Sequence, residues 1–255
     1  MKHQTESYLL KKEQCPECAK LGKDRNHDNL ALYSDGHSYC FSCGYTNRIW
    51  NSLSTTSESN KKPYKEIQIT LPIDCDTSYP ANALKWISQY ELSSNDLLSN
   101  NVLWSEQHKR LIFPIYGDIG LLAYQGRYFG SEINKPKWWG QGDLANTFHI
   151  IKGRSLQPTL ILTEDIVSAI KVSRYAPAMP LFGCSIGIKR FKRLYKLLGY
   201  QADIKIWLDP DKRKEAIKES RKGTLCGLKT SVIISNKDPK EESYETIRSS
   251  TKINN

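Results

Sequence analysis

The sequence predicts a mixed fold, α/β in its larger part and α+β overall, in which a small N-terminal ribbon precedes a domain with a mainly parallel sheet. Three observations predict it. Two close pairs of cysteines lie within residues 1–50, residues 51–63 contain almost no apolar side chain, and short apolar strands alternate with helices from about residue 158. Such alternation is typical of a parallel sheet that helices cover on both faces.

These features divide the chain into five segments. The Ser/Thr/Asn-rich stretch NSLSTTSESNKKP is expected to be a flexible linker. The last twenty residues are polar, and we expect part of them to be flexible or to contact a partner protein. The predicted segments are the ribbon domain (1–50), the linker (51–63), the first part of the large domain (64–157), the parallel-sheet subdomain (158–235) and the C-terminal tail (236–255).

The paired cysteines indicate a metal-binding ribbon. Cys15-x-x-Cys18 and Cys40-x-x-Cys43 are separated by 21 residues. Two such pairs complete a tetrahedral site of four sulfur atoms, which leaves no open position for water, so the ion would be structural Zn²⁺. An iron–sulfur or redox role is the alternative. A module of about 50 residues buries little core, and metal binding would supply much of its folding free energy.

Between the cysteine pairs, the sequence predicts a β-hairpin. Asp35-Gly36 is a turn signal, and the residues around it favour strands. Residues 1–60 carry seven Lys/Arg and seven Asp/Glu, so this part is formally neutral. A neutral module is better suited to reading base edges than to gripping phosphates. A ribbon used only for contact with another protein is the alternative.

The large domain shows elements of both kinds. A helix is expected at 81–90, and strands at 110–116 and 120–128 are joined by a turn at Gly117-Asp118. The later part alternates strands with helices. The expected strands are 159–163, 179–183, 203–208 and 230–235, and the expected helices follow residue 165 and cover 187–198 and 211–222.

Acidic side chains follow two of these strands directly. Glu164 comes directly after the strand 159–163, and Asp209-x-Asp211 comes directly after the strand 203–208. The carboxyl ends of parallel strands share one edge of a sheet, so the three carboxylates are expected to lie close together. Oxygen ligands of this kind suit Mg²⁺ or Mn²⁺. Asp-Pro-Asp-Lys is also typical of a turn and helix N-cap, which is the structural alternative.

The excess positive charge lies in residues 61–255, where 30 basic residues face 20 acidic ones and bring the whole chain to +10. A basic surface favours nucleic acid as a partner. Trp138-Trp139 could stack on bases or belong to the core. The basic residues expected to face phosphates are Arg127, Lys135, Lys137, Lys189, Arg190, Lys192, Arg193, Lys212, Arg213 and Lys214.

The sequence has no run of 18 apolar residues, and its first residues lack the apolar core of a signal peptide. We therefore expect a cytoplasmic protein without a membrane partner. Cys75, Cys184 and Cys226 are expected to be ordinary structural thiols.

Taken in order, these motifs resemble a known family. A four-cysteine ribbon with Ser-Asp-Gly-His, then Tyr-Gln-Gly-Arg and Lys-Pro-Lys, then strands that end in Glu164 and in Asp209-x-Asp211 resemble phage-type DNA primases. The similarity is to the primase half of phage primase–helicases and, more distantly, to bacterial DNA primases. Residues 158–235 resemble a Toprim subdomain, so the large domain would be an RNA-polymerase domain of the primase type.

The resemblance implies a role for each motif. Glu164, Asp209 and Asp211 would hold the catalytic Mg²⁺ or Mn²⁺, and Asp35 with His37 would help the ribbon read the template. Arg127, Lys135 and Lys137 would contact ribonucleoside triphosphates or the primer. The partners would be single-stranded DNA, nucleotides and a replicative helicase in trans, since the sequence contains no Gly-x-x-x-x-Gly-Lys-Ser/Thr phosphate loop. The cellular compartment would be the cytoplasm of a host bacterium.

The sequence departs from the Toprim pattern at two places. Asp165 stands where a glycine usually follows the first Glu, and Lys212-Arg213-Lys214 stands where an Ala-Gly step usually follows the Asp-x-Asp. Asp165 is either an extra metal ligand or a helix cap. Two other functional classes stay open: a Toprim-type nuclease, and a non-catalytic zinc-ribbon protein that binds DNA or loads a helicase.

Overall fold

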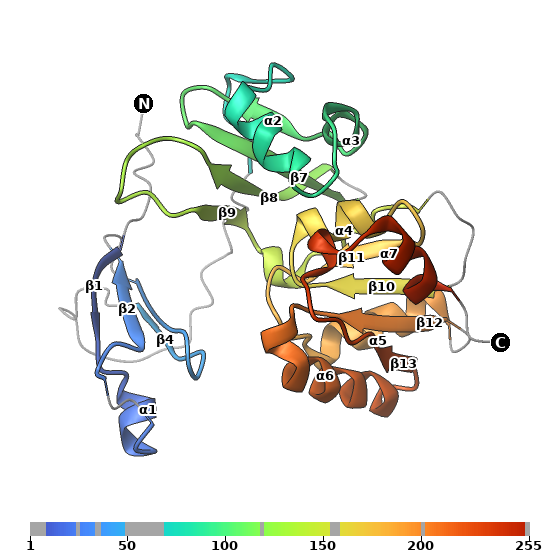
Figure 1. The fold of residues 1–255 in the computed structure, drawn as a ribbon. Coiled ribbons are helices and arrows are strands. Elements are labelled where there is room, and N and C mark those ends of the chain that lie inside the picture. The colour runs from blue at the N-terminus through green and yellow to red at the C-terminus, as the bar shows by residue number, and fades with distance from the viewer. Residues whose placement is uncertain are drawn as a thin grey trace. The chain divides into compact units, whose positions relative to one another are not determined.

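The structure is a computed structural model that describes residues 9–23, 26–33, 37–48, 69–117, 120–153, 159–199 and 202–252. The chain forms two compact units (Figure 1). The ribbon unit comprises residues 1–67 and 131–136, and the larger unit comprises 68–130 and 137–255. The linker predicted at 51–63 lies outside the described residues.

The ribbon unit contains a four-stranded antiparallel sheet in the order β1-β2-β3-β4. Its interior holds three of the four paired cysteines and Leu30, with Leu32 and Tyr45 packed against them. So small an apolar interior provides little stabilisation by itself. The elements are β1 (Leu9–Glu13), α1 (Pro16–Lys20), β2 (Leu30–Tyr33), β3 (His37–Cys40) and β4 (Thr46–Arg48).

The first part of the larger unit is a five-stranded antiparallel sheet in the order β5-β6-β7-β8-β9. The two strands expected on either side of Gly117 pair directly, from Arg110 opposite Tyr128 to Gly117 opposite Gly120. The elements are β5 (Cys75–Asp76), α2 (Ala81–Ser88), α3 (Ser94–Ser99), β6 (Leu103–Ser105), β7 (Arg110–Gly117), β8 (Gly120–Tyr128), β9 (Trp138–Gly142) and the 3₁₀ turn η1 (Leu144–Asn146).

The second part is the predicted parallel sheet, in the order β11-β10-β12-β13 with every ladder parallel. Together with the four-cysteine cluster, it confirms the expected α/β fold class. The elements are β10 (Thr159–Thr163), α4 (Ile166–Val172), β11 (Ala178–Pro180), α5 (Ile188–Leu198), β12 (Asp203–Trp207), η2 (Pro210–Lys212), α6 (Arg213–Leu225) and β13 (Lys229–Val232).

Side chains alternate across this sheet, and helices bury both faces. Ile161 of β10 belongs to the same apolar cluster as α4, whereas Leu160 and Leu162 belong to a second cluster with Phe191 and Leu194 of α5. The first cluster also contains Phe113 of the antiparallel sheet. A shared core therefore joins the two sheets into one unit and fixes the geometry between them. In the described part of the chain, no helix is long and apolar enough to cross a membrane.

The C-terminal tail, predicted at 236–255, forms helical structure over much of its described part, residues 236–252. That part of the tail is flexible or contacts a partner stays a prediction. Residues 239–241 form a 3₁₀ turn, η3 (Pro239–Glu241), and α7 (Tyr244–Thr251) follows. Ile247 is fully buried in the core that α4 and the antiparallel sheet share. Residues 238–251 therefore belong to the larger unit as an integral part of its core.

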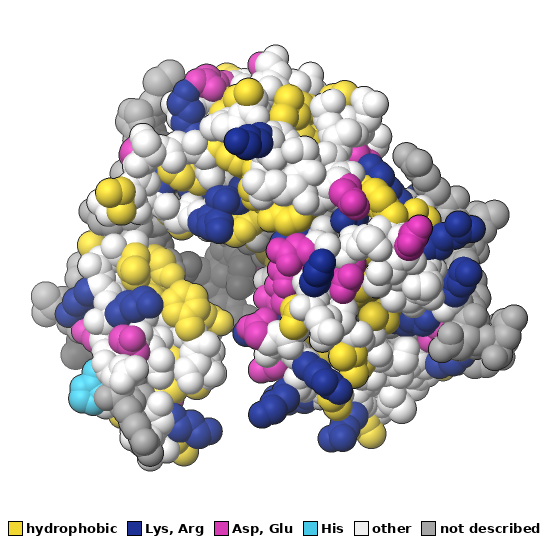
Figure 2. Space-filling view, in the orientation of Figure 1, with side chains coloured by type: hydrophobic (Ala, Val, Ile, Leu, Met, Phe, Trp, Pro, Cys, Tyr) yellow, Lys and Arg dark blue, Asp and Glu magenta, His cyan; other side chains and the backbone are white. Residues whose placement is uncertain are grey.

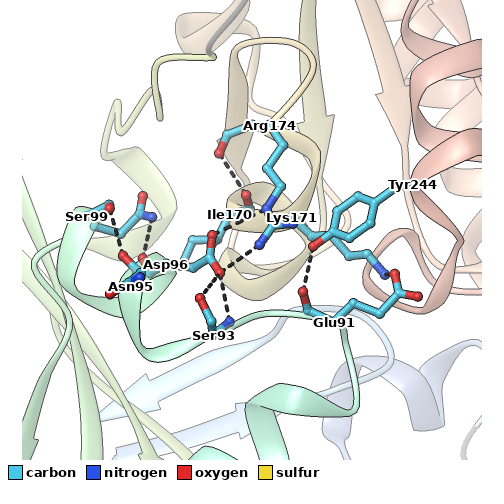
Figure 3. Close-up of polar contacts among 11 residues, drawn as sticks. Glu91, Ser93, Asn95, Asp96, Ser99, Ile170, Lys171, Arg174 and Tyr244 are labelled. Atoms are coloured by element: carbon cyan, nitrogen blue, oxygen red, sulfur yellow. Dashed lines mark hydrogen bonds and ion pairs between the residues drawn. The ribbon is translucent and has the colours of Figure 1, made fainter.

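A polar network fastens α3, α4 and α7 to one another (Figure 3). The Tyr244 hydroxyl donates to the carbonyl oxygen of Glu91 at 2.6 Å, and the Arg174 guanidinium lies 4.4 Å from the centre of the Tyr244 ring. Arg174 also donates twice to the Asp96 carboxylate, at 2.7 and 3.3 Å. Ser93 donates to the same carboxylate and completes the capping box of α3. Arg174 thus links the Asp96 carboxylate to the Tyr244 ring, and the network joins three segments that are distant in sequence.

Replacing Asp96 with alanine should therefore destabilise the larger unit by about 3 kcal/mol, since it removes a helix cap and leaves a half-buried guanidinium unpaired. Urea unfolding followed by tryptophan fluorescence measures this, because five of the six tryptophans lie in that unit. Asn95→Ala, a change at an exposed neighbouring position, is the control. Equal losses for the two variants would contradict the prediction.

Candidate active site and zinc centre

The four paired cysteines converge in the ribbon unit. Their sulfur atoms all lie within 4.8 Å of one another, with Cys15 and Cys43 at 3.6 Å and Cys18 and Cys40 at 3.7 Å. Four sulfurs at about 2.3 Å from a zinc ion would stand roughly 3.8 Å apart along the edges of a tetrahedron. The observed separations fit that ion closely, and the cluster supports one structural zinc.

The environment of Cys40 favours the thiolate that zinc requires. Burial disfavours this charge, but backbone N–H groups of Cys43 and Ser42, with the thiols of Cys15 and Cys43, outweigh the burial and lower the pKa of Cys40 to about 7. Burial and the neighbouring thiols raise the pKa of Cys18 and of Cys43, so the four sulfurs share their protons unequally until a metal binds. The Cys43 N–H lies 3.5 Å from the Cys40 sulfur. Turns of this kind, in which N–H groups point at sulfur, are what the Cys-x-x-Cys spacing predicts. Asp35 and the side chain of His37, predicted to read the template, lie outside the described residues.

A polar pocket of about 480 Å³ lies in the larger unit. It is bounded by the antiparallel sheet and α2 on one side, and by the carboxyl ends of β10 and β12 and residues 238–241 on the other. Figure 2 shows acidic side chains gathered along one edge of this unit. The lining residues are Trp86, Tyr90, Gln125, Arg127, Lys137, Trp138, Glu164, Asp165, Val167, Phe182, Gly183, Asp209, Asp238, Lys240 and Glu241.

Glu164 and Asp209 lie at the carboxyl ends of neighbouring parallel strands, as their positions in the sequence predict. Thr163 and Trp207, the last residues of β10 and β12, are partners in the ladder. One oxygen of each carboxylate, Oε2 of Glu164 and Oδ1 of Asp209, is buried without a hydrogen-bond partner. Buried carboxylate oxygens without donors are costly. A cation between them would satisfy both.

The electrostatics of the pocket lead to the same conclusion. Burial, with Asp238 and Glu164 nearby, raises the pKa of Asp209 to about 7 despite the opposing charge of Lys240. Burial is also the main cause of the raised pKa of Glu164, to which Asp211 and Asp165 add. Carboxyl groups whose charged forms are disfavoured in this way gain most from a bound divalent ion.

Asp165, which replaces the usual glycine, serves as a helix cap. Its Oδ1 accepts hydrogen bonds from the backbone N–H groups of Val167 and Ser168 at the start of α4. Its Oδ2 accepts from the Ser168 hydroxyl and lies 3.1 Å from Nζ of Lys240. Of the two roles the sequence allowed, the structure supports the cap.

Asp211 lies apart from the pocket lining. Its side chain is 70% exposed and pairs with Lys212 at 2.6 Å. Residues 210–212 turn as a single 3₁₀ segment before α6, so the Asp-x-Asp pair does not keep the two-residue alternation of a strand. Among the described residues, the four cysteines are the one group of three or more His, Cys, Asp or Glu whose ligand atoms lie this close. A metal-binding role for Asp211 stays a prediction.

Aromatic rings hold Arg127 in the pocket. The guanidinium lies 5.1 Å from the ring centre of Trp86, 5.3 Å from Phe129 and 5.7 Å from Trp138. Its Nη1 donates to the carbonyl oxygen of Tyr128 at 2.9 Å, while Nε is buried without a partner. Stacking and hydrogen bonds thus fix the position of this charge in the pocket that Glu164 and Asp209 also line.

The other predicted nucleotide contacts differ in position. Lys137 is exposed and lines the pocket. Lys135 pairs with Glu132 at 3.1 Å in the segment 131–136, which belongs to the ribbon unit, and it is not among the lining residues. Arg190 was predicted to face phosphate, and this is wrong. It is 4% exposed and donates to the carbonyl oxygens of Ala145, Pro180 and Leu181.

Several pocket residues escaped the sequence analysis. Trp86 and Tyr90 lie four residues apart on the predicted helix 81–90, with ring centres 5.5 Å apart, so helical spacing could have placed them on one face. Asp238 and Lys240 come from the polar tail, which has no pattern that predicts a site. Trp138 packs against the core and also lines the pocket, and its stacking on a base stays a prediction.

Comparison with known proteins gives only structural matches. No protein-family model matches the sequence, and neither does any curated protein. The primase fragment of the bacteriophage T7 primase–helicase is 16% identical, with a TM-score of 0.47 over 91% of this chain and 93% of the T7 chain. The zinc-binding and RNA polymerase domains of the Aquifex aeolicus primase are 17% identical, with a TM-score of 0.43 over 64% of this chain and 45% of that one.

A third similar structure contains T7 primase domains with the lagging-strand DNA polymerase, an RNA/DNA hybrid and dTTP. It is 14% identical, with a TM-score of 0.43 over 95% of each chain. All three structures contain primase domains.

Proposed function

We propose that this chain is a DNA primase that synthesises short RNA primers on single-stranded DNA. The observation that carries the proposal is the pocket of the larger unit. Glu164 and Asp209, each with one buried oxygen that has no hydrogen-bond partner, line the same cavity as Arg127 with its stacked guanidinium. A metal-binding pair of carboxylates opposite a fixed cation is suited to a nucleotide triphosphate.

Glu164 and Asp209 would hold the catalytic Mg²⁺ or Mn²⁺, joined by Asp211 if its exposed side chain turns inward. When bound, the ion would neutralise the triphosphate and favour in-line displacement at the α-phosphorus by a 3′-hydroxyl. Arg127 and Lys137, with Lys135, would bind the phosphates of the nucleotide or primer. The rings of Trp86, Tyr90 and Trp138 are positioned in the same pocket, where an exposed ring face could stack on a base.

The ribbon unit would select the template. Its formal charge over residues 1–60 is zero, which favours reading of bases over gripping of phosphates, and Asp35 and His37 would take part. The chain would work in the cytoplasm with a replicative helicase supplied in trans.

One experiment separates the functional classes. The protein is incubated with end-labelled single-stranded DNA of mixed sequence, four ribonucleotides carrying a second label, and Mg²⁺. New short RNA with intact DNA is the expected result. Degraded DNA without RNA would favour a nuclease. Binding with neither reaction, unchanged in Glu164→Ala and Asp209→Ala, would favour a non-catalytic DNA-binding protein.

Binding of single-stranded DNA should weaken steeply with salt, because exposed Lys189 and Lys192 on α5 add to the excess charge beyond residue 60. The slope of log affinity against log salt is negative, and each lost phosphate contact makes it shallower by about 0.7. Changing both lysines to serine should therefore make the slope shallower by about 1.4. Fluorescence anisotropy at several salt concentrations measures it. Lys229→Ser, at an exposed site on β13, is the control, and an unchanged slope in the double variant would contradict the prediction.

A further inference from the structure

A lysine lies inside the acidic pocket. Lys240 lines the cavity together with Glu164, Asp165, Asp209 and Asp238, and its side chain is 16% exposed. What we infer about this lysine rests on the proposed function, because it concerns which carboxylates of the pocket pair with the lysine and which are left to bind a metal ion.

Five acids line the cavity. Glu241 is exposed, and two of the other four are already paired with this lysine. Nζ of Lys240 lies 2.7 Å from Oδ2 of Asp238 and 3.1 Å from Oδ2 of Asp165. Asp165 is further committed to the N-terminus of α4. The remaining pair, Glu164 and Asp209, keeps one bare buried oxygen each. The ammonium group of Lys240 thus neutralises Asp165 and Asp238, and Glu164 with Asp209 is left for a metal ion.

The position of Lys240 is fixed by its backbone as well as by its side chain. Nζ of Lys171, a side chain only 2% exposed, donates to the carbonyl oxygen of Lys240 at 3.0 Å and pairs with Glu91 at 3.1 Å. Residue 240 belongs to η3, which contacts α4, and α7 follows it directly. The Lys240 residue is therefore held at its backbone by Lys171 and at its ammonium group by Asp165 and Asp238.

The charge balance keeps Lys240 protonated. Burial opposes the charge, but the carboxylates of Asp165, Asp238 and Asp209 outweigh burial and hold the pKa of Lys240 above its ordinary value. At neutral pH the pocket therefore contains a permanent positive charge beside the two free carboxylates.

We propose that Lys240 takes the place of a second divalent ion, so that the pocket binds one Mg²⁺ or Mn²⁺, held by Glu164 and Asp209. Many phosphoryl-transfer sites use two metal ions about 3.5–4 Å apart. Here the ammonium on Asp165 and Asp238 fills the second position, and it repels another cation that approaches the same carboxylates.

Counting bound Mn²⁺ tests this. The zinc-loaded full chain is titrated with Mn²⁺, and the free ion is measured by electron paramagnetic resonance. Wild type should bind one ion. Lys240→Met should bind two, because it frees Asp165 and Asp238, and its first ion should bind roughly tenfold tighter once the nearby positive charge is gone. Lys240→Arg, which keeps the charge, should bind one ion.

Two controls isolate the effect. Lys237→Met removes an exposed lysine from the same segment and should leave the count at one. The double variant Lys240→Met with Asp238→Asn removes an acid together with the lysine and should return the count from two to one. Thermal unfolding and zinc content show whether each variant is folded.

Two ions in wild type, or a folded Lys240→Met variant with an unchanged count and affinity, would overturn the role of Lys240 and leave the primase proposal intact. No Mn²⁺ bound to wild type would overturn the metal site of the proposed function as well. The wild-type count decides the main point even if the methionine variant does not fold.

Discussion

Replacing Asp209 with asparagine is expected to abolish RNA synthesis and, without magnesium, to make the larger unit more stable. The raised pKa of Asp209, about 7, means that its charged form is disfavoured in the folded protein. Asparagine removes that charge but keeps the size of the side chain. Allowing for solvent screening, the gain at pH 8 should be about 1–2 kcal/mol. This corresponds to roughly 2–8 °C in Tm for a unit of this size.

The raised pKa of Asp209 also determines how the stability of the fold changes with pH. The folded protein holds the Asp209 proton more tightly than the unfolded chain, so this group stabilises the fold at low pH. That stability is lost as the pH rises from about 4 through about 7. Wild type should therefore lose more stability than Asp209→Asn between pH 5 and pH 8. Added Mg²⁺ should restore wild type at pH 8 and have little effect on the variant.

Differential scanning fluorimetry measures both effects. Magnesium is removed by dialysis, because a chelator would also take the zinc. Asp211→Asn is the matched stability control, since its exposed side chain should change the unfolding free energy by less than about 0.5 kcal/mol. A lower Tm in Asp209→Asn, or no stabilisation of wild type by Mg²⁺, would show that the pair of carboxylates does not hold a metal.

Loss of the zinc is expected to have the second large effect. Cys40→Ser should unfold the ribbon unit, whose interior consists mainly of the cysteines, Leu30 and two partly buried side chains. Zinc binding supplies on the order of 10 kcal/mol in small zinc modules, far more than this core can replace. Initiation at a template site should then be lost, while extension of a pre-made primer by the larger unit partly survives.

Gel assays of initiation and of primer extension, with zinc content by mass spectrometry, test this. Cys226→Ser changes a half-buried thiol outside the cluster and is the control, which should keep one zinc and both activities. If Cys40→Ser reduces initiation and extension equally, the two units do not divide the work as proposed.

The parallel sheet was predictable because its strands lie in short runs rich in apolar residues that alternate with helical segments. The strand at 159–163 agrees residue for residue, and the other three differ by one to three residues at their ends. The ends of β11 and β13 shift most, by three residues each, and β11 ends at Pro180. Phe182 takes a left-handed conformation with φ of 57°, so the chain leaves the sheet at the rim of the pocket. A backbone angle of this kind leaves no trace in apolar periodicity.

The short elements were not predictable. α3 has a single buried side chain, Leu97, and α7 has Ile247 and Thr251, so neither shows a long apolar stripe. α7 is stabilised by contacts made far along the chain, such as that between Tyr244 and Glu91. Tertiary packing decides such helices, and local sequence carries little of that information.

In the candidate site, too, some residues were predictable from the sequence and others were not. Glu164 and Asp209 were predictable because strand order alone brings them to one edge. The outward direction of Asp211 was not, because it depends on how the turn at Pro210 leaves the strand. Lys240 enters the pocket only because residues 236–251 return across the larger unit.

Template-directed RNA synthesis is the most direct test of the central claim. Wild type and Asp209→Asn are each given single-stranded DNA of defined mixed sequence, ribonucleotides and Mg²⁺, and the labelled products are sequenced. Short RNA complementary to the DNA from wild type, and none from the folded variant, is the predicted result. No complementary RNA from wild type, with Mg²⁺ or Mn²⁺ and across all template sequences, would contradict the account.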